Sequence, residues 1–179
     1  APFAIERGLV RPEKGKQKTS VRIFMENSRK VAIATVETPE SNLTYNGQTY
    51  IDGVTSPSAP ISLEFLDIEG SLCGKLLPTG NPKDEVDGYS VTLIDNGMPC
   101  EIIEAGQLGV EGNENVEELE KNSTMRERLE SLRLKCGIII QLGNVKEKTV
   151  PKMTIVSKPL SNGMINTRTF IPHRCHRSI

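Results

Sequence analysis

The sequence predicts an α+β fold that is rich in short β-strands and contains one long amphipathic helix. Several segments alternate apolar and polar residues with a period of two and are bounded by Gly, Pro, Asn and Asp, which is typical of half-buried strands. One segment, 124–142, instead repeats apolar residues at steps of three and four, the spacing of a helix packed on one side. With 179 residues, of which 36% are hydrophobic, the chain can bury the core of one globular domain or of two small lobes.

The first half of the chain is expected to be mostly β-structure. Residues 1–8 are typical of the last turns of a helix closed by Gly8, and no initiator Met precedes them. Because this helix lacks its beginning, we expect the chain to be a central excerpt of a longer polypeptide. Alternation over 21–36, interrupted by turn residues at 27–30, predicts a β-hairpin, and shorter strands are expected at 43–45, 50–51 and 61–66.

A boundary between two lobes is expected at residues 74–82. This segment holds two Gly and two Pro in nine residues and is followed by the charged run 83–87. The sequence therefore predicts one lobe over residues 1–82 and a second over residues 83–179.

The second lobe is expected to combine strands with the single long helix. Strands are predicted at 89–93 and 100–105, and a hairpin at 150–157 and 164–170. Between them, the pair Thr124 and Glu127 predicts a capping box at the start of the helix, and Gly143 predicts its end. The helix is expected to bury one face on the sheet, formed by Met125, Leu129, Leu132, Cys136 and Ile139.

Composition argues against several classes of function. The 22 basic and 23 acidic residues are well mixed, the net charge is −1 and aromatics are 4%, so the basic stripe and stacking aromatics of a nucleic-acid-binding protein are missing from the sequence. No apolar run approaches the roughly 20 residues of a transmembrane helix, so no membrane partner is expected and a cytoplasmic location is predicted. Four cysteines without a C-x-x-C pair are expected to be reduced thiols, Cys73, Cys100, Cys136 and Cys175.

The most distinctive group of titratable residues lies near the C-terminus, within 173–177. A thiol, two imidazoles and two guanidinium groups follow one another there: His173, Arg174, Cys175, His176 and Arg177. Such a cluster suits polycarboxylate binding or proton transfer, because cations lower the pKa of a thiol and imidazoles titrate near neutrality. Two alternatives stay open at this level: a positively charged strand end without chemistry, and a zinc-binding interaction module, for which the sequence offers no further ligand pair.

Two further segments are candidate ligand contacts. The segment 74–82 lacks the order of residues of a phosphate-binding P-loop and is better explained as a turn, with Lys75 as an anion contact. The turn formed by Asn96, Gly97, Met98 and Pro99 can aim backbone N–H groups at a ligand, because Gly97 permits close approach and Pro99 stiffens the exit. By themselves, these residues favour an ordinary hairpin turn.

Five long strings, in order along nearly the whole chain, resemble the family of methylaconitate isomerases (PrpF) and 4-oxalomesaconate tautomerases. They are Pro2-Phe-Ala-Ile-Glu-Arg-Gly-Leu-Val10, Gly74-Lys-Leu-Leu-Pro-Thr-Gly-Asn81, Leu93-Ile-Asp-Asn-Gly-Met-Pro99, Val150-Pro-Lys-Met153 and Phe170-Ile-Pro-His-Arg-Cys-His176. The resemblance implies a diaminopimelate epimerase-like fold, in which two β-rich half-barrels surround central helices and a cleft between lobes holds the active site. It implies that this fold is present here only in part: 1–82 would be the later part of the first lobe and 83–179 the opening of the second.

The resemblance also implies which residues bind substrate. Asn96 to Pro99 would stand where related epimerases present a Gly-Asn-Pro-His turn, and Ser28 where relatives carry Asn-Thr-Gly, a departure expected to alter that loop. Cys175, His173 and His176 would be the candidate catalytic groups, although Cys175 precedes the position of the second catalytic cysteine of the epimerases. The cysteine and lysine that relatives use for proton transfer would lie before Ala1.

The function predicted from this resemblance is cofactor-independent isomerisation of a small unsaturated di- or tricarboxylate by proton transfer, without a metal. The Gly74–Asn81 and Asp95–Cys100 strings favour the keto–enol tautomerase of aromatic-acid degradation over the alternative, a 2-methylaconitate cis–trans isomerase. Lys75, Arg174 and Arg177 would hold substrate carboxylates. Two other expectations are a non-catalytic fragment that binds ligands, and a homo-oligomer formed through an exposed sheet edge.

Overall fold

The computed structural model describes residues 1–26, 29–51, 54–161 and 163–177. The chain divides into two compact units, Ala1–Ile68 and Glu69–Ile179. Residues 69–82, which the expected boundary at 74–82 assigned to the first lobe, belong to the second unit. Gly70 donates its backbone N–H to Asp95 O at 2.7 Å, and Asp95 N–H bonds to Leu76 O at 2.8 Å. The division therefore falls after Ile68.

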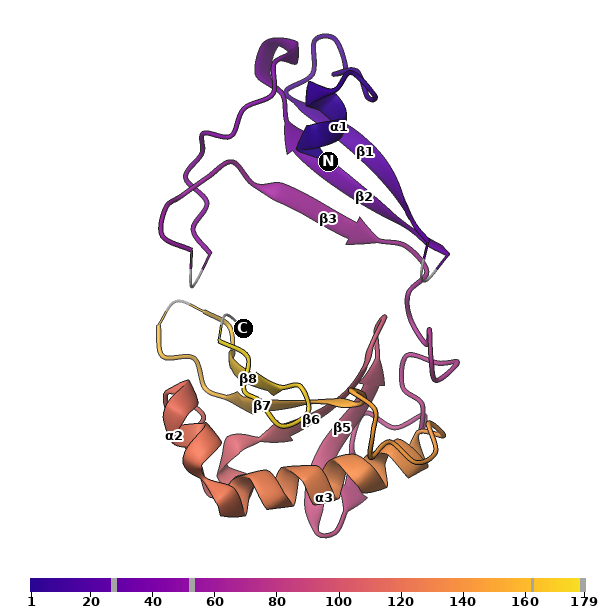
Figure 1. The fold of residues 1–179 in the computed structure, drawn as a ribbon, viewed down its shortest axis with the longest axis vertical. Helices are drawn as coiled ribbons and strands as arrows, with labels where there is room; N and C mark the ends of the chain where they lie inside the picture. Colours follow the sequence, from indigo (N-terminus) through magenta and orange to yellow (C-terminus); the bar gives the residue numbers. More distant parts are fainter. Residues whose placement is uncertain (27–28, 52–53, 162, 178–179) are drawn as a thin grey trace. The chain divides into compact units, whose positions relative to one another are not determined.

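The first unit is a three-stranded antiparallel sheet covered in part by a short helix (Figure 1). Helix α1 (Pro2–Glu6) is followed by β1 (Lys18–Met25), β2 (Lys30–Glu37), a 3₁₀ turn at Pro39–Ser41, and β3 (Ile61–Phe65), in the sheet order β1-β2-β3. Ile5 of α1 packs with Val21, Ala34 and Val36 in the core of this unit. The predicted hairpin over 21–36 is thus confirmed as β1 and β2, and Gly8 follows the helix with a positive φ of 68°.

The strands expected at 43–45 and 50–51 are wrong. Both segments are irregular backbone, and the backbone bonds near them include the isolated bridge between Thr49 and Ser58 and a bond from Ala59 N–H to Tyr45 O. Gly47 explains the geometry, since a Cβ at this position would lie 2.5 Å from Ala59 Cα. The chain therefore folds back on itself here as a compact loop.

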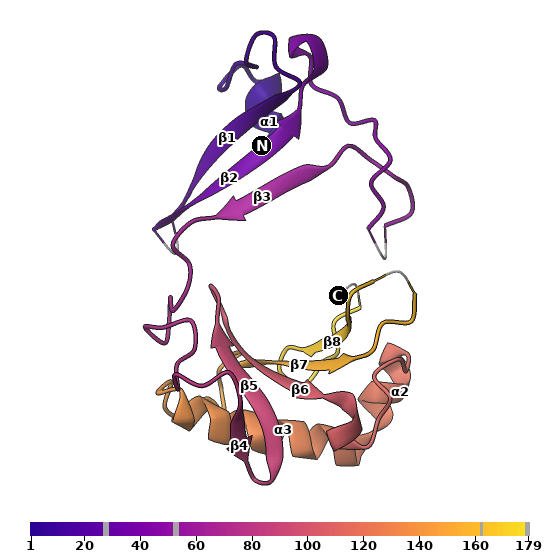
Figure 2. The ribbon, with the colours of Figure 1, turned by 180° about the vertical axis from the view of Figure 1, so that it is seen from behind.

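The second unit is a five-stranded sheet with its long helix lying along one face (Figures 1 and 2). Its strands are β4 (Asp84–Val86), β5 (Tyr89–Asp95), β6 (Pro99–Glu104), β7 (Lys152–Ser157) and β8 (Asn166–Phe170), in the order β4-β5-β6-β7-β8. All neighbours are antiparallel except β6 and β7, which are parallel. The connection between β6 and β7 contains the 3₁₀ turn Ala105–Leu108, α2 (Val116–Lys121) and α3 (Ser123–Ile139).

Helix α3 confirms the predicted helix, but it ends at Ile139 rather than just before Gly143, and its start and packing also differ in detail. Asn122 is the N-cap and accepts the Met125 N–H, so the Thr124–Glu127 capping box is wrong; the capping box is instead at Asn115 and Glu118 of α2, a helix that we did not predict. The buried face contains Met125, Leu129, Leu132 and Cys136 as expected, whereas Ile139 is exposed and Ile140 is buried. These residues pack on Leu93, Ile103, Met153 and Ile155 of the sheet in the main core.

The hairpin predicted at 150–157 and 164–170 is confirmed by the antiparallel pairing of β7 and β8. Within the described residues, none of the helices combines the length and apolar character needed to cross a bilayer. The four cysteines are unpaired thiols.

Candidate functional site

The candidate residues of the second unit lie at neighbouring strand ends, along one edge of its sheet. The register pairs Asp95 with Pro99, Cys100 with Lys152, and Met153 with Phe170. The end of β5, the starts of β6 and β7 and the end of β8 consequently share this edge. The turn 96–99 and the terminal segment 171–177 both leave the sheet here, with β7 standing between them.

Asp95 fixes the turn 96–99 to the segment that carries Lys75. Its carboxylate is fully buried and accepts the backbone N–H groups of Leu72 and Cys73 at 2.7 and 2.8 Å. Bonds to a buried carboxylate stabilise such a turn strongly, because the carboxylate has lost its water. Gly70 allows this close approach: its φ is +66°, and a Cβ would lie 2.3 Å from Lys75 N.

The predicted anion contact Lys75 is therefore placed on a well-tied loop beside Asn96, to which Glu69 forms a β-bridge. Gly97 has a φ of 88° and lies between Asp95 and Pro99, in the turn that joins β5 to β6. Cys73 packs close to Asp95, and burial together with that carboxylate raises the pKa of the Cys73 thiol to about 11. The thiol is thus protonated at neutral pH and carries no negative charge that could pair with Lys75.

The terminal segment turns back along β8 immediately after Phe170. Ile171 N–H bonds to Arg174 O at 2.9 Å, and Phe170 forms a bridge with Cys175. His176 N–H then bonds to Thr169 O at 2.7 Å. This tight turn points neighbouring side chains in different directions, so the five residues of the sequence cluster do not form one constellation.

Cys175 is directed into the core rather than toward solvent. It is 5% exposed and packs with the main cluster, and its backbone N–H bonds to Glu120 Oε1 at 3.1 Å. Burial is the main cause of a raised pKa for its thiol, with Glu120 adding to the effect and Arg168 opposing it. A thiol in this setting is protonated at neutral pH and is a weak nucleophile.

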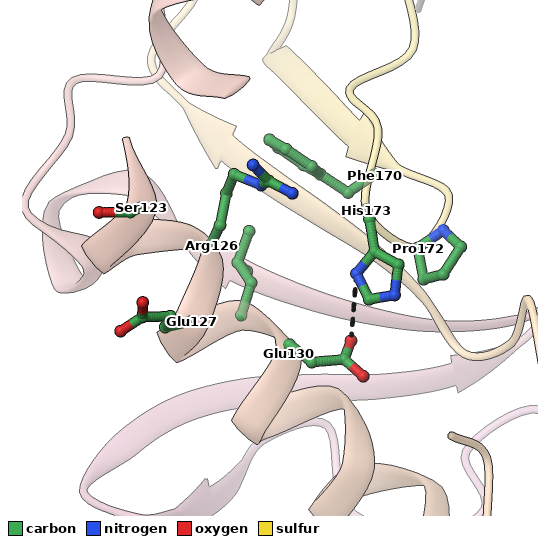
Figure 3. A pocket seen from close by; sticks show the side chains of 8 residues that line it. Ser123, Arg126, Glu127, Glu130, Phe170, Pro172 and His173 are labelled. Atoms are coloured by element: carbon green, nitrogen blue, oxygen red, sulfur yellow. Dashed lines mark ion pairs between the residues drawn. The ribbon is translucent and has the colours of Figure 1, made fainter. Parts of the chain in front are cut away.

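His173 lies at a cavity of about 380 Å³ between α3 and the terminal turn (Figure 3). Helix residues at steps of three and four form one wall, and the turn forms the other: Ser123, Arg126, Glu127, Leu129 and Glu130 face Phe170, Pro172 and His173. The imidazole Nδ1 is 3.8 Å from Glu130 Oε2. Protonated His173 would form an ion pair with Glu130. When the ring is neutral, the Glu130 carboxylate keeps its bonds to its other partner.

That other partner is Arg133, a fully buried guanidinium on α3. Its Nε and Nη2 bind the two carboxylate oxygens of Glu130 at 2.7 and 2.8 Å. Its Nη1 donates to three backbone carbonyls of the α3–β7 loop, those of Val145, Lys148 and Val150. Sequence reasoning missed this pair, although an arginine at a position of the apolar face, one residue after Leu132, was a usable signal.

Arg174 lines a second cavity of about 360 Å³ next to the first, together with its neighbour His173. The other lining residues are charged side chains of α2 and α3: Glu117, Glu120, Lys121 and Arg126. Arg126 and His173 belong to both cavities, and Arg126 Nη1 bonds to Glu120 O at 3.1 Å. Arg177 lies 3.7 Å from Glu117 with both side chains largely exposed, a contact that contributes little to stability.

A model for the family described as PrpF protein matches residues 1–179 of the chain. The chain belongs to the PrpF family. Among PrpF relatives, it is 49% identical over 178 residues both to a (4E)-oxalomesaconate Delta-isomerase from Novosphingobium sp. strain KA1 and to a 4-oxalomesaconate tautomerase from Pseudomonas putida KT2440. Each alignment covers 99% of this chain and 49% of the relative.

The solved structure of a methylitaconate-delta-isomerase superposes with a TM-score of 0.84 at 27% identity, covering 98% of this chain and 51% of that one. The resemblance drawn from the five sequence strings is therefore confirmed, as is the α+β, diaminopimelate epimerase-like fold of the PrpF family. The chain spans about half the length of the curated relatives that it matches.

In this PrpF protein, the candidate residues of the second unit thus form two separate groups at one edge of its sheet. Lys75 and the turn 96–99 form the first group, and His173 and Arg174 form the second, beside α3. Ser28 lies outside the described residues. The described parts of the chain contain no group of three or more His, Cys, Asp and Glu side chains able to hold a metal ion, so the zinc alternative has no ligand set there.

Proposed function

We propose that the protein containing this chain is an isomerase of small unsaturated di- or tricarboxylates, acting as a keto–enol tautomerase on 4-oxalomesaconate or a close analogue. The observation that carries the proposal is the 49% identity to two enzymes named for oxalomesaconate, against 27% to a methylitaconate isomerase. A 2-methylaconitate isomerase remains the competing assignment within the same reaction class.

The reaction needs a base that removes an acidified proton, an acid that returns a proton three atoms away, and donors that stabilise the enolate between the two steps. In this proposal, the chain supplies chiefly the donors. The turn 96–99 offers backbone N–H groups, and Lys75 offers a cation beside it on the loop held by Asp95. Fixed donors of this kind stabilise developing negative charge without reorganising during the reaction.

At the other end of the sheet edge, Arg174 supplies a second cation for a substrate carboxylate, and the His173 imidazole lies beside it as a candidate proton-transfer group. The contact of its Nδ1 with Glu130 Oε2, at 3.8 Å, would orient the ring for that role. Cys175, with a buried and protonated thiol, is best suited to fixing the terminal turn. We further infer a cytoplasmic protein, because four unpaired thiols suit a reducing compartment.

The test is an assay of the full-length protein with 4-oxalomesaconate, 2-methylaconitate and methylitaconate, following the change in ultraviolet absorbance. We expect kcat/KM for 4-oxalomesaconate to exceed the other two by about tenfold or more, the discrimination that a few substrate contacts provide. A preference for 2-methylaconitate would assign the competing activity. Ligand binding without turnover of any of the three would overturn the enzyme assignment in favour of a binding protein.

Two variants ask whether this chain contributes to the site. Lys75→Met and Arg174→Met should each lower kcat/KM by about 10- to 100-fold, because each removes a charge-assisted contact to a carboxylate. Lys158→Met is the matched control, since Lys158 is exposed after β7, at the opposite edge of the sheet, and should leave kcat/KM unchanged. Equal rates for all three variants would remove Lys75 and Arg174 from the substrate site.

A further inference from the structure

Glu101 is a carboxylic acid in the middle of the apolar contact between the second sheet and α3. It lies on β6 in the row that pairs Leu93 with Glu101 and Glu101 with Met153, the row that packs against the helix. The residue is fully buried, and within the described residues neither of its carboxyl oxygens has a hydrogen-bond partner of good geometry. An ionised carboxylate in such surroundings is strongly unfavourable.

The groups facing Glu101 come from α3. Cys136 is fully buried, and its thiol is a weak donor and acceptor, and the Arg133 charge also acts on Glu101. The guanidinium of Arg133 is, however, already engaged with Glu130 and with the carbonyls of the α3–β7 loop. The acidic residues Asp84 and Asp87, from β4 and the turn after it, also act on Cys136 and further disfavour a negative charge on its thiol.

We propose that Glu101 is a proton-dependent switch. When Glu101 is neutral, α3 packs closely against the sheet around it. When Glu101 is ionised, its charge attracts Arg133 away from Glu130. Glu130 forms a wall of the cavity at His173. The protonation state of Glu101 thereby controls how strongly Arg133 holds Glu130 in the wall of that cavity. The inference does not depend on which substrate the protein uses.

The direction of the pH effect follows from burial, which raises the pKa of Glu101 to about 7 from an ordinary value of 4.5, while Cys136 and Arg133 act weakly in the opposite direction. The folded state then binds a proton that the unfolded state has already lost between these two values. Stability contributed by neutral Glu101 is complete below the unfolded pKa, decreases as the pH rises toward 7, and is lost above it.

The first measurement is equilibrium unfolding of the whole chain in denaturant from pH 5 to pH 8.5, for the wild type, Glu101→Gln and Glu104→Gln. We expect the unfolding constant of the wild type to rise, relative to that of Glu101→Gln, by up to about tenfold per pH unit between pH 5 and pH 7, and to level off above. Glu104 is an exposed residue on the same strand, so Glu104→Gln should follow the wild type. A constant ratio between wild type and Glu101→Gln would overturn the proposal.

The second measurement needs no folded variant. The infrared spectrum of the wild type should show the band of a protonated carboxyl group at pH 6 that disappears by pH 9, because exposed carboxylates are already ionised at pH 6. The NMR signal of the Arg133 Nε–H, which donates to Glu130 and does not itself titrate, should shift over the same pH range, because ionised Glu101 attracts the guanidinium. Absence of the carboxyl band at pH 6 refutes the neutral form, and a carboxyl band whose loss leaves the Arg133 Nε–H signal unchanged refutes the coupling to Glu130.

Discussion

Arg133 links the buried core to the wall of the cavity at His173. It occupies a position on the apolar face of α3, where a charged side chain is stable only if its hydrogen bonds are satisfied. Glu130 supplies two acceptors and the α3–β7 loop supplies three carbonyls. The arginine therefore acts as a tie between the helix, the loop and the cavity wall.

Replacement of Arg133 by Met should lower the free energy of unfolding by about 3 kcal/mol, because it leaves the loop carbonyls and Glu130 without their donor. Removal of the Arg133 charge should also raise the pKa of Glu101, since that charge now lowers it. Denaturant unfolding measures the first effect. Arg128→Met, at an exposed position of the same helix, is the control and should change stability by less than about 0.5 kcal/mol. Equal losses for both variants would contradict the tie.

At the scale of elements, the start of α3 shows how a correct helix prediction can carry a wrong cap. Thr124 and Glu127 have the spacing of a capping box, yet the side chain that accepts the first free N–H is Asn122, bonded to Met125 N at 3.0 Å. The reason is α2, which ends at Lys121 and delivers the chain directly into α3. Asn122 is therefore both the C-cap of α2 and the N-cap of α3.

Asn122→Ala should therefore cost about 1 kcal/mol of stability, the ordinary value of a lost N-cap. Thr124→Ala, the variant that the sequence pattern singles out, should cost less than about 0.5 kcal/mol because Thr124 is an exposed residue within the first turn. Thermal or denaturant unfolding of both variants decides between the two caps. A larger loss for Thr124→Ala would restore the capping box predicted from the sequence.

At the scale of the whole chain, each unit has its own core, but the first leaves apolar surface uncovered. Strand β3 is an edge of its sheet, and the side chains of Ile61, Leu63 and Phe65 are 45%, 54% and 47% exposed on the face that α1 covers over β1 and β2. A flat apolar edge strand of this kind pairs readily with another chain.

We expect the 179-residue chain to self-associate, and Leu63→Lys to weaken this association by about tenfold or more by placing a charge on the apolar face. Sedimentation velocity over a range of concentrations measures the effect. Ser62→Lys is the control, because Ser62 is exposed on the same strand but points to the opposite face. A chain that stays monomeric at all concentrations would contradict the prediction.

The sequence alone determined the class of fold, the β1–β2 and β7–β8 hairpins, the existence of α3 and the family. These depend on local periodicity, turn residues and long characteristic strings, all of which lie within short stretches of chain. The apolar positions of α3 from Met125 to Cys136 were predictable for the same reason. Lys75 and the turn 96–99 were predicted separately as ligand contacts, and only the tertiary structure shows that they lie side by side.

Only the tertiary structure decided the division after Ile68, the start of α3 at Asn122 and the separation of the terminal cluster into different directions. These outcomes depend on contacts between residues that are distant in the sequence. The Asp95 carboxylate, for example, accepts the backbone N–H of Leu72. The turn after Phe170 buries Cys175 and places His173 at the cavity. A one-dimensional pattern contains no such distances. For the same reason, the acid Glu101 and the base Arg133 became visible only when the sheet and α3 enclosed them.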